Sequence, residues 1–137
     1  MKSIVIIDDN KNFLEMYKMQ GEHDGFAVFE SDEGDKGIEL IKAKQPDIIL
    51  LDLVMAPKDG YEVLKEIKTN ELTAHIPVIV VTNIDNEKDK QAAHTLGAVA
   101  YCLKSDYTPK TLFEKVDEVL GKSFSSAKPA SRVKVKA

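Results

Sequence analysis

The chain has 137 residues, 43% of them apolar and 31% charged, with a formal net charge of −4. That length is enough for one domain with its own hydrophobic core. A lone cysteine, Cys102, excludes a disulfide framework and favours a reducing compartment. No stretch approaches the ~20 apolar residues of a membrane span, and the apolar run at 4–7 is too short for a secretion signal. We therefore expect a cytoplasmic protein without membrane insertion.

Charge is unevenly distributed along the chain. Five basic residues and no acidic residue follow Gly121, so the first 121 residues hold 14 basic and 23 acidic residues, a net charge of −9. We expect no nucleic-acid binding by this acidic part, because phosphate backbones are bound by basic surfaces. Residues 122–137 show no hydrophobic period and predict a basic, disordered tail. Its charges could hold an anionic partner, although a solvated extension is the simpler interpretation.

Short apolar runs alternate with helical patterns from the N-terminus onward. The runs at 4–7, 48–51 and 78–81 are rich in β-branched residues and nearly unbroken. Such runs are typical of strands covered on both faces of a parallel sheet. The runs at 26–29 and 99–103 are shorter or less β-branched and suit the edges of the sheet. Five repeats of strand and helix predict a right-handed, doubly wound α/β fold.

The helical stretches between these runs differ in how much apolar surface they carry. The last one has the clearest stripe, formed by Leu112, Phe113, Val116, Val119 and Leu120. Thr108 and Pro109 predict its start and Gly121 predicts its end. The stretch at 85–97 is the weakest, since its apolar face holds only Ala92, Ala93 and Leu96. A lightly packed helix of this kind is more easily moved than the others.

Chemically active side chains follow four of the predicted strands. Asp8 and Asp9 come after the first, Asp52 after the third, Thr82 ends the fourth and Lys104 follows the fifth. The carboxyl ends of parallel strands meet at one edge of a sheet, so these groups should converge there. Each residue alone could be a helix cap or a loop cation. Together, carboxylates ~5 Å apart repel by on the order of 3 kcal/mol per pair, which a hard divalent cation, most naturally Mg²⁺, would offset.

The same set of groups suggests a reaction. A carboxylate is a competent nucleophile toward phosphorus and forms an aspartyl phosphate. Asp52 is the best placed acceptor, because it ends the central apolar run. Mg²⁺ and Lys104 would neutralise charge on the phosphoryl oxygens, and the Thr82 hydroxyl would donate a hydrogen bond to one of them.

Several motifs in order carry a family resemblance. The segment 6–10, the segment 51–55 leading to Asp59 and Gly60, Thr82 and Lys104 together resemble the receiver domain of two-component response regulators, in particular the single-domain chemotaxis type. The resemblance implies a flavodoxin-like (βα)5 three-layer sandwich with strand order 2-1-3-4-5, occupying residues 1–121. It also implies a monomer or a weak phosphorylation-dependent dimer.

The resemblance assigns roles to individual residues of the metal site. Asp52 is the implied phosphoacceptor and a metal ligand. Asp9 would ligate Mg²⁺ directly, Asp8 mainly through water, and the backbone carbonyl of Val54 would be a further ligand. The phosphoryl donor would be a phosphohistidine on a sensor histidine kinase or a histidine phosphotransfer protein.

A second set of implied roles concerns the switch. Thr82 and Tyr101 match the switch pair, in which the hydroxyl moves toward the phosphoryl group and the aromatic ring turns inward behind it. Lys104 would form a salt bridge to a phosphoryl oxygen. The switch would alter the surface that an unidentified downstream protein recognises. We expect no enzymatic activity beyond self-catalysed phosphotransfer to Asp52 and self-dephosphorylation.

The chain also departs from the family pattern. Proline is displaced by one place in Met55-Ala56-Pro57, and Ser105 replaces the proline usual after the lysine, which leaves open whether the Lys104–Ser105 peptide is cis. The alternative function is a receiver-like protein-binding module that no longer depends on phosphorylation. The sequence also leaves open whether the protein is a terminal effector or an intermediate of a phosphorelay.

Overall fold

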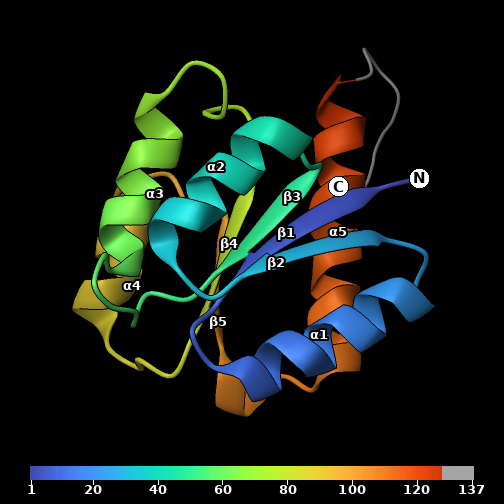
Figure 1. The fold of residues 1–137 in the computed structure, drawn as a ribbon, viewed down its shortest axis with the longest axis horizontal. Helices are drawn as coiled ribbons and strands as arrows, with labels where there is room; N and C mark the ends of the chain where they lie inside the picture. The colour runs from blue at the N-terminus through green and yellow to red at the C-terminus, as the bar shows by residue number, and fades with distance from the viewer. Residues whose placement is uncertain (128–137) are drawn as a thin grey trace.

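The computed structural model describes the backbone of residues 1–127 and the side chains of residues 1–121. Strands and helices alternate along the chain, as the hydrophobic pattern predicts (Figure 1). The elements are β1 (Ser3–Ile7), α1 (Lys11–His23), β2 (Ala27–Ser31), α2 (Gly34–Lys44), β3 (Ile48–Leu51), α3 (Gly60–Thr69), β4 (Val78–Thr82), α4 (Glu87–Thr95), β5 (Ala100–Leu103), a short 3-10 turn η1 (Lys104–Asp106) and α5 (Pro109–Ala127).

The five strands form one parallel sheet in the order β2-β1-β3-β4-β5. This order confirms the predicted doubly wound topology. Every residue of β3 and β4 is buried, whereas β2 and β5 are partly exposed at the two edges. The strand order reverses between β1 and β3, and in open α/β sheets ligands bind at such a point, at the carboxyl ends of the strands.

Helices cover both faces of the sheet (Figure 1). Alternate strand residues point to opposite faces, so that Val5 and Ile7 join one core while Ile4 and Ile6 join the other. The first core includes the buried faces of α2 and α3 with one residue of α4, and the second includes those of α1 and α5. The result is the predicted three-layer sandwich.

The structure corrects several predicted boundaries. Helix α5 continues through Gly121 to Ala127, so the predicted end at Gly121 is wrong, and the predicted tail begins inside the helix. An interior glycine costs a helix only about 1 kcal/mol relative to alanine, too little to end it. The rest of the predicted tail, residues 128–137, lies outside the described residues.

Smaller corrections concern β2 and α4. Strand β2 begins at Ala27, because Phe26 is buried against Phe113 in an edge-on contact before the strand starts. Ala92 is exposed, so Ala93 is the buried residue of α4 and Leu96 is partly buried at its end. The Lys104–Ser105 peptide is trans, and within residues 1–127 a cis bond occurs only before Pro57. In that same range no helix is long and apolar enough to cross a bilayer.

Candidate functional site

Three aspartates meet at the carboxyl edge of the sheet. Asp8 and Asp9 directly follow β1 and Asp52 directly follows β3; one carboxylate oxygen of each lies within 4.8 Å of the others. Asp8 and Asp52 are buried, at 2% and 6% exposed, whereas Asp9 is exposed to solvent. The predicted convergence of the three acids is therefore confirmed, with an exposed member that leaves the cluster open to solvent.

Lys104 brings the opposite charge into the same cluster from the end of β5. Its Nζ lies 2.8 Å from Asp8 Oδ2 and 3.0 Å from Asp52 Oδ2, and its side chain is only 4% exposed. One ammonium group thus pairs with two buried carboxylates while Asp9 stands outside the pair. Three carboxylates against one ammonium leave an excess of negative charge beside two buried acids, a condition that favours a bound cation.

Burial and charge shift the pKa values of this cluster. Burial raises the pKa of the Asp8 carboxyl, and the charge of Asp52 raises it further, against the hydrogen bonds from Lys104 and the Asn10 amide. Burial lowers the pKa of Lys104, but the hydrogen bond to Asp8 and the charges of both carboxylates outweigh it, so the pKa is raised overall. Lys104 therefore stays protonated at neutral pH.

Thr82 and Tyr101, the predicted switch pair, are linked through the backbone of Ile84. The Ile84 amide donates to Thr82 Oγ1 over 3.4 Å, and the Tyr101 hydroxyl donates to the Ile84 carbonyl over 2.8 Å. Thr82 is fully buried at the end of β4, and Tyr101 is partly buried. A displacement of Thr82 would thus move the peptide that Tyr101 holds. Sequence spacing alone does not reveal this backbone link.

The loop from β3 to α3 holds Asp52 in place. The Val54 amide donates to Asp52 Oδ1 over 3.2 Å, and the Gly60 amide donates to the Leu53 carbonyl over 2.9 Å. A Cβ on Gly60 would lie 2.2 Å from the Asp52 carbonyl oxygen, closer than any real contact. Glycine is thus required at residue 60 for α3 to approach the acceptor strand. The Val54 side chain is 55% exposed.

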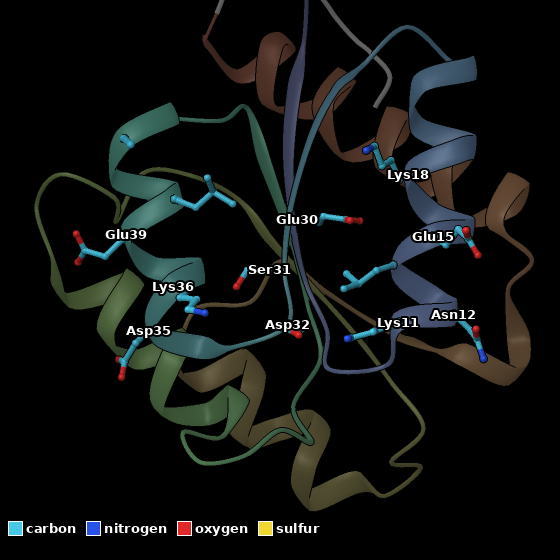
Figure 2. A pocket seen from close by; sticks show the side chains of 13 residues that line it. Lys11, Asn12, Glu15, Lys18, Glu30, Ser31, Asp32, Asp35, Lys36 and Glu39 are labelled. Atoms are coloured by element: carbon cyan, nitrogen blue, oxygen red, sulfur yellow. The ribbon is translucent and has the colours of Figure 1, made fainter.

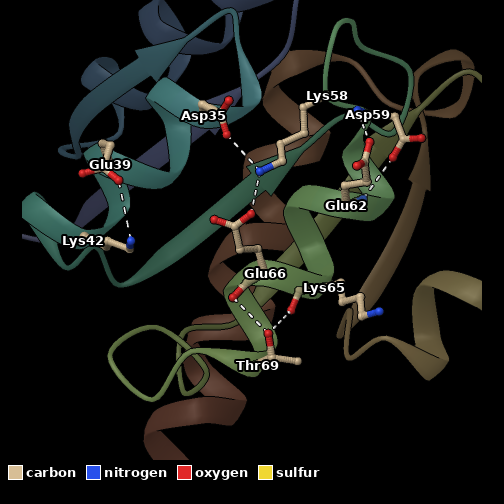
Figure 3. A network of polar contacts seen from close by, with 9 residues as sticks. All are labelled: Asp35, Glu39, Lys42, Lys58, Asp59, Glu62, Lys65, Glu66 and Thr69. Atoms are coloured by element: carbon tan, nitrogen blue, oxygen red, sulfur yellow. Dashed lines mark hydrogen bonds and ion pairs between the residues drawn. The ribbon is translucent and has the colours of Figure 1, made fainter.

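Lys58 anchors the same loop from outside, a role that sequence reasoning missed. Its Nζ forms ion pairs with Asp35 of α2 and Glu66 of α3, so the loop is tied to both neighbouring helices (Figure 3). Asp59 closes a capping box with Glu62 at the start of α3. Sequence spacing could have revealed the capping box, but not the ion pairs, which join three separate segments.

A separate groove lies away from the acidic cluster. It has a volume of about 1030 Å³ and runs along the edge strand β2 between α1 and α2 (Figure 2). Lys11, Glu15 and Lys18 line one wall, and Lys36 and Glu39 line the other. The groove is wide and open and mixes both charges, whereas the convergent acidic and basic groups lie in the small acidic cluster. Geometry therefore favours the cluster as the site of chemistry.

A parallel sheet in this strand order, with an acidic cluster and a paired lysine at its carboxyl edge, defines the class of receiver domains. The model of the response regulator receiver domain family matches residues 4–117. The chain belongs to this family, whose members act in two-component signalling, typically by phosphorylation of an aspartate. Binding of Mg²⁺ at an acidic pocket and interaction with histidine kinases or phosphotransfer proteins are likewise typical of the family.

Individual relatives agree with this assignment. The chain is 34% identical to protein PilH of Pseudomonas aeruginosa, over 88% of this chain and 98% of PilH. It is 29% identical to the alkaline phosphatase synthesis transcriptional regulatory protein PhoP of Bacillus subtilis, over 97% of this chain and 54% of PhoP. The structure resembles a CheY-like receiver domain protein from Methanospirillum hungatei, with a TM-score of 0.85, 25% identity and coverage of 92% of this chain and 98% of that one.

Proposed function

We propose that Asp52 is the phosphoacceptor of this receiver domain and that the acidic cluster holds Mg²⁺ during the reaction. The observation that carries the proposal is the meeting of Asp8, Asp9 and Asp52 within 4.8 Å, with Lys104 on two of them. Among the three acids, Asp52 ends the central strand, and both of its oxygens are held, one by Lys104 and one by the Val54 amide. We take residues 1–121 as the functional unit, which contains the whole family match at residues 4–117.

The donor set suits a hard divalent cation. Carboxylate oxygens from Asp8, Asp9 and Asp52 and the Val54 carbonyl would hold Mg²⁺, which prefers oxygen ligands and retains water. Bound there, the ion would offset negative charge on the transferring phosphoryl group. Because Asp9 is exposed, it offers the ion and its water an entrance from solvent.

The protein's own groups supply the rest of the chemistry. An Asp52 carboxylate oxygen attacks phosphorus; the new O–P bond forms as the N–P bond of the donor phosphohistidine breaks, and the electron pair stays on the departing imidazole nitrogen. Lys104 is already within 3.0 Å of Asp52, so it can follow the charge onto the phosphoryl oxygens with little reorganisation. The loop anchored by Gly60 and Lys58 keeps the acceptor oriented.

Signal output follows from the link between Thr82, Ile84 and Tyr101. A phosphoryl group on Asp52 adds a hydrogen-bond acceptor for the Thr82 hydroxyl, which now accepts from the Ile84 amide and would turn toward the phosphoryl oxygen. That movement shifts the peptide to which Tyr101 donates. The altered surface near α4 and β5 would then be recognised by a downstream protein in the cytoplasm.

The test is the intact mass of the protein after incubation with acetyl phosphate and Mg²⁺. Wild type should gain one phosphoryl group, while Asp52→Ala and a chelator-treated sample should gain none. Asp59→Asn, which alters a capping carboxylate outside the cluster, is the matched control and should still be phosphorylated. An adduct on Asp52→Ala, or no adduct on wild type, would contradict the proposal; the latter would favour the phosphorylation-independent binding module.

A further inference from the structure

The ammonium group of Lys104 also contacts an aromatic ring. The Phe13 ring centroid lies 4.2 Å from Lys104 Nζ, well inside the range of a cation–π contact. Phe13 is partly buried and packs on Tyr17 at a centroid distance of 5.6 Å. The ring therefore lies over the same ammonium group that Asp8 and Asp52 hold.

Hydrogen bonds at the start of α1 hold the backbone of Phe13 in place. Asn10 is the N-cap of α1, and its side chain accepts hydrogen bonds from the amides of Asn12 and Phe13. Asn10 also donates its own amide to Asp8 Oδ1 over 2.9 Å. The same turn therefore sets the positions of an acid of the cluster and of the ring over Lys104.

We propose that Phe13 is a positioning residue for phosphotransfer. Its ring keeps the Lys104 ammonium beside Asp52 while the carboxylates that pair with Lys104 bind the metal ion or the phosphoryl group. This inference rests on the proposed function. When Asp8 and Asp52 turn their oxygens to a metal ion or to phosphorus, Lys104 loses the partners that now hold it. The Phe13 ring binds neither the metal ion nor the phosphorus and remains against the ammonium throughout. It also keeps water from that side of the charge, which strengthens the attraction of Lys104 for phosphoryl oxygens.

The kinetic test uses acetyl phosphate at saturating concentration, because a small donor requires no docking of a partner protein on α1. Phe13→Leu keeps an apolar side chain but removes the ring, and it should slow phosphorylation of Asp52 by about three- to tenfold. Phe13→Tyr keeps the ring face and should restore most of the rate. Phe29→Leu is the matched control, since it removes a ring that contacts Lys44 at 4.9 Å, away from the cluster, and it should not slow the reaction.

A spectroscopic readout separates positioning from a general loss of structure. Protons on the Lys104 ε-carbon should be shifted upfield in NMR spectra by the Phe13 ring current, with and without beryllofluoride and Mg²⁺. The shift should vanish in Phe13→Leu and persist in Phe13→Tyr. Ordinary Lys104 shifts in wild type, or an unchanged rate in Phe13→Leu, would overturn the proposal. Failure of the proposed function is distinguishable, because wild type would then gain no phosphoryl group.

Discussion

Helices α4 and α5 lie on opposite faces of the sheet and are held in opposite ways. Helix α5 buries Leu112, Phe113, Val116 and Leu120 in the second core. Helix α4 buries only Ala93, and its first turn is attached by a hydrogen bond from the Tyr61 hydroxyl to Asp89. Helix α5 is thus fixed by apolar packing, which is insensitive to small displacements of charge. Helix α4 is fixed by a polar contact close to the site.

This difference indicates where a signal can leave the domain. Tyr61 directly follows Gly60, which is wedged against the backbone of Asp52, so the α4 attachment begins one residue from the acceptor loop. Tyr101 holds the loop before α4 through the Ile84 carbonyl. We therefore expect a change of charge at Asp52 to act on the contacts that hold α4, while α5 provides the rigid reference.

The largest expected effect contrasts the packing of the two helices. Phe113→Ala removes a fully buried ring of α5 and should lower the free energy of unfolding by about 3–5 kcal/mol. Ala93→Gly in α4 should lower it by about 1 kcal/mol, mainly through helix propensity. Urea denaturation measures both. Equal losses would show that α4 contributes as much to the core as α5 does.

A second prediction concerns how long the signal lasts. Val54 and Ile84 place apolar side chains near the acceptor and in the loop before α4, where polar groups could orient a hydrolytic water. The double variant Val54→Asn and Ile84→Glu should lose phosphate from Asp52 on the order of tenfold faster, since hydrogen bonds worth about 1 kcal/mol each would hold the water. Phosphate release is followed after removal of the donor. Unaltered decay in the double variant would argue against a role for these two side chains.

A third prediction removes the attachment of α4 to α3. Tyr61→Phe deletes only the hydroxyl that donates to Asp89. It should cost α4 about 1 kcal/mol of local stability and raise hydrogen exchange of α4 amides about fivefold. Amides of α5 serve as the internal control and should exchange as in wild type. If both helices respond equally, the hydrogen bond stabilises the whole domain and is not specific to α4.

The smallest effect is the pH dependence contributed by Tyr101. Burial, followed by the charges of Asp89 and Asp85, raises the pKa of its phenol to about 12 from the usual 10.0. Between these values the unfolded chain releases a proton that the folded protein retains, so stability falls as pH rises from about 10 to 12. Tyr101→Phe should show a shallower fall in urea denaturation over this window. Identical slopes would mean that the phenol ionises equally in both states.

Sequence patterns predicted the parts of this molecule that depend on local spacing. The meeting of Asp8, Asp52 and Lys104 follows from where each apolar run ends, because parallel strands present their carboxyl ends at one edge. The strand order is implied by the family resemblance, and the structure confirms it. Two kinds of feature could not be predicted: contacts between segments distant in sequence, and element ends whose local signal is weak. The ion pairs of Lys58 are of the first kind, because they join three segments distant in sequence.

The end of α5 shows the second kind. A glycine after an apolar stripe predicts a helix stop, but Gly121 lies inside α5, with open space where a Cβ would be. Nothing there requires left-handed backbone geometry, so helix propagation prevails over the weak local signal.

The most direct test of this account is hydrogen exchange with beryllofluoride and Mg²⁺, in wild type and in Asp52→Ala. We expect changed exchange in α4, in the loop that contains Ile84 and in β5 of wild type. Exchange on the buried face of α5 should be unchanged, and Asp52→Ala should show no response. Changes of equal size in α4 and α5, or a response that survives in Asp52→Ala, would contradict it.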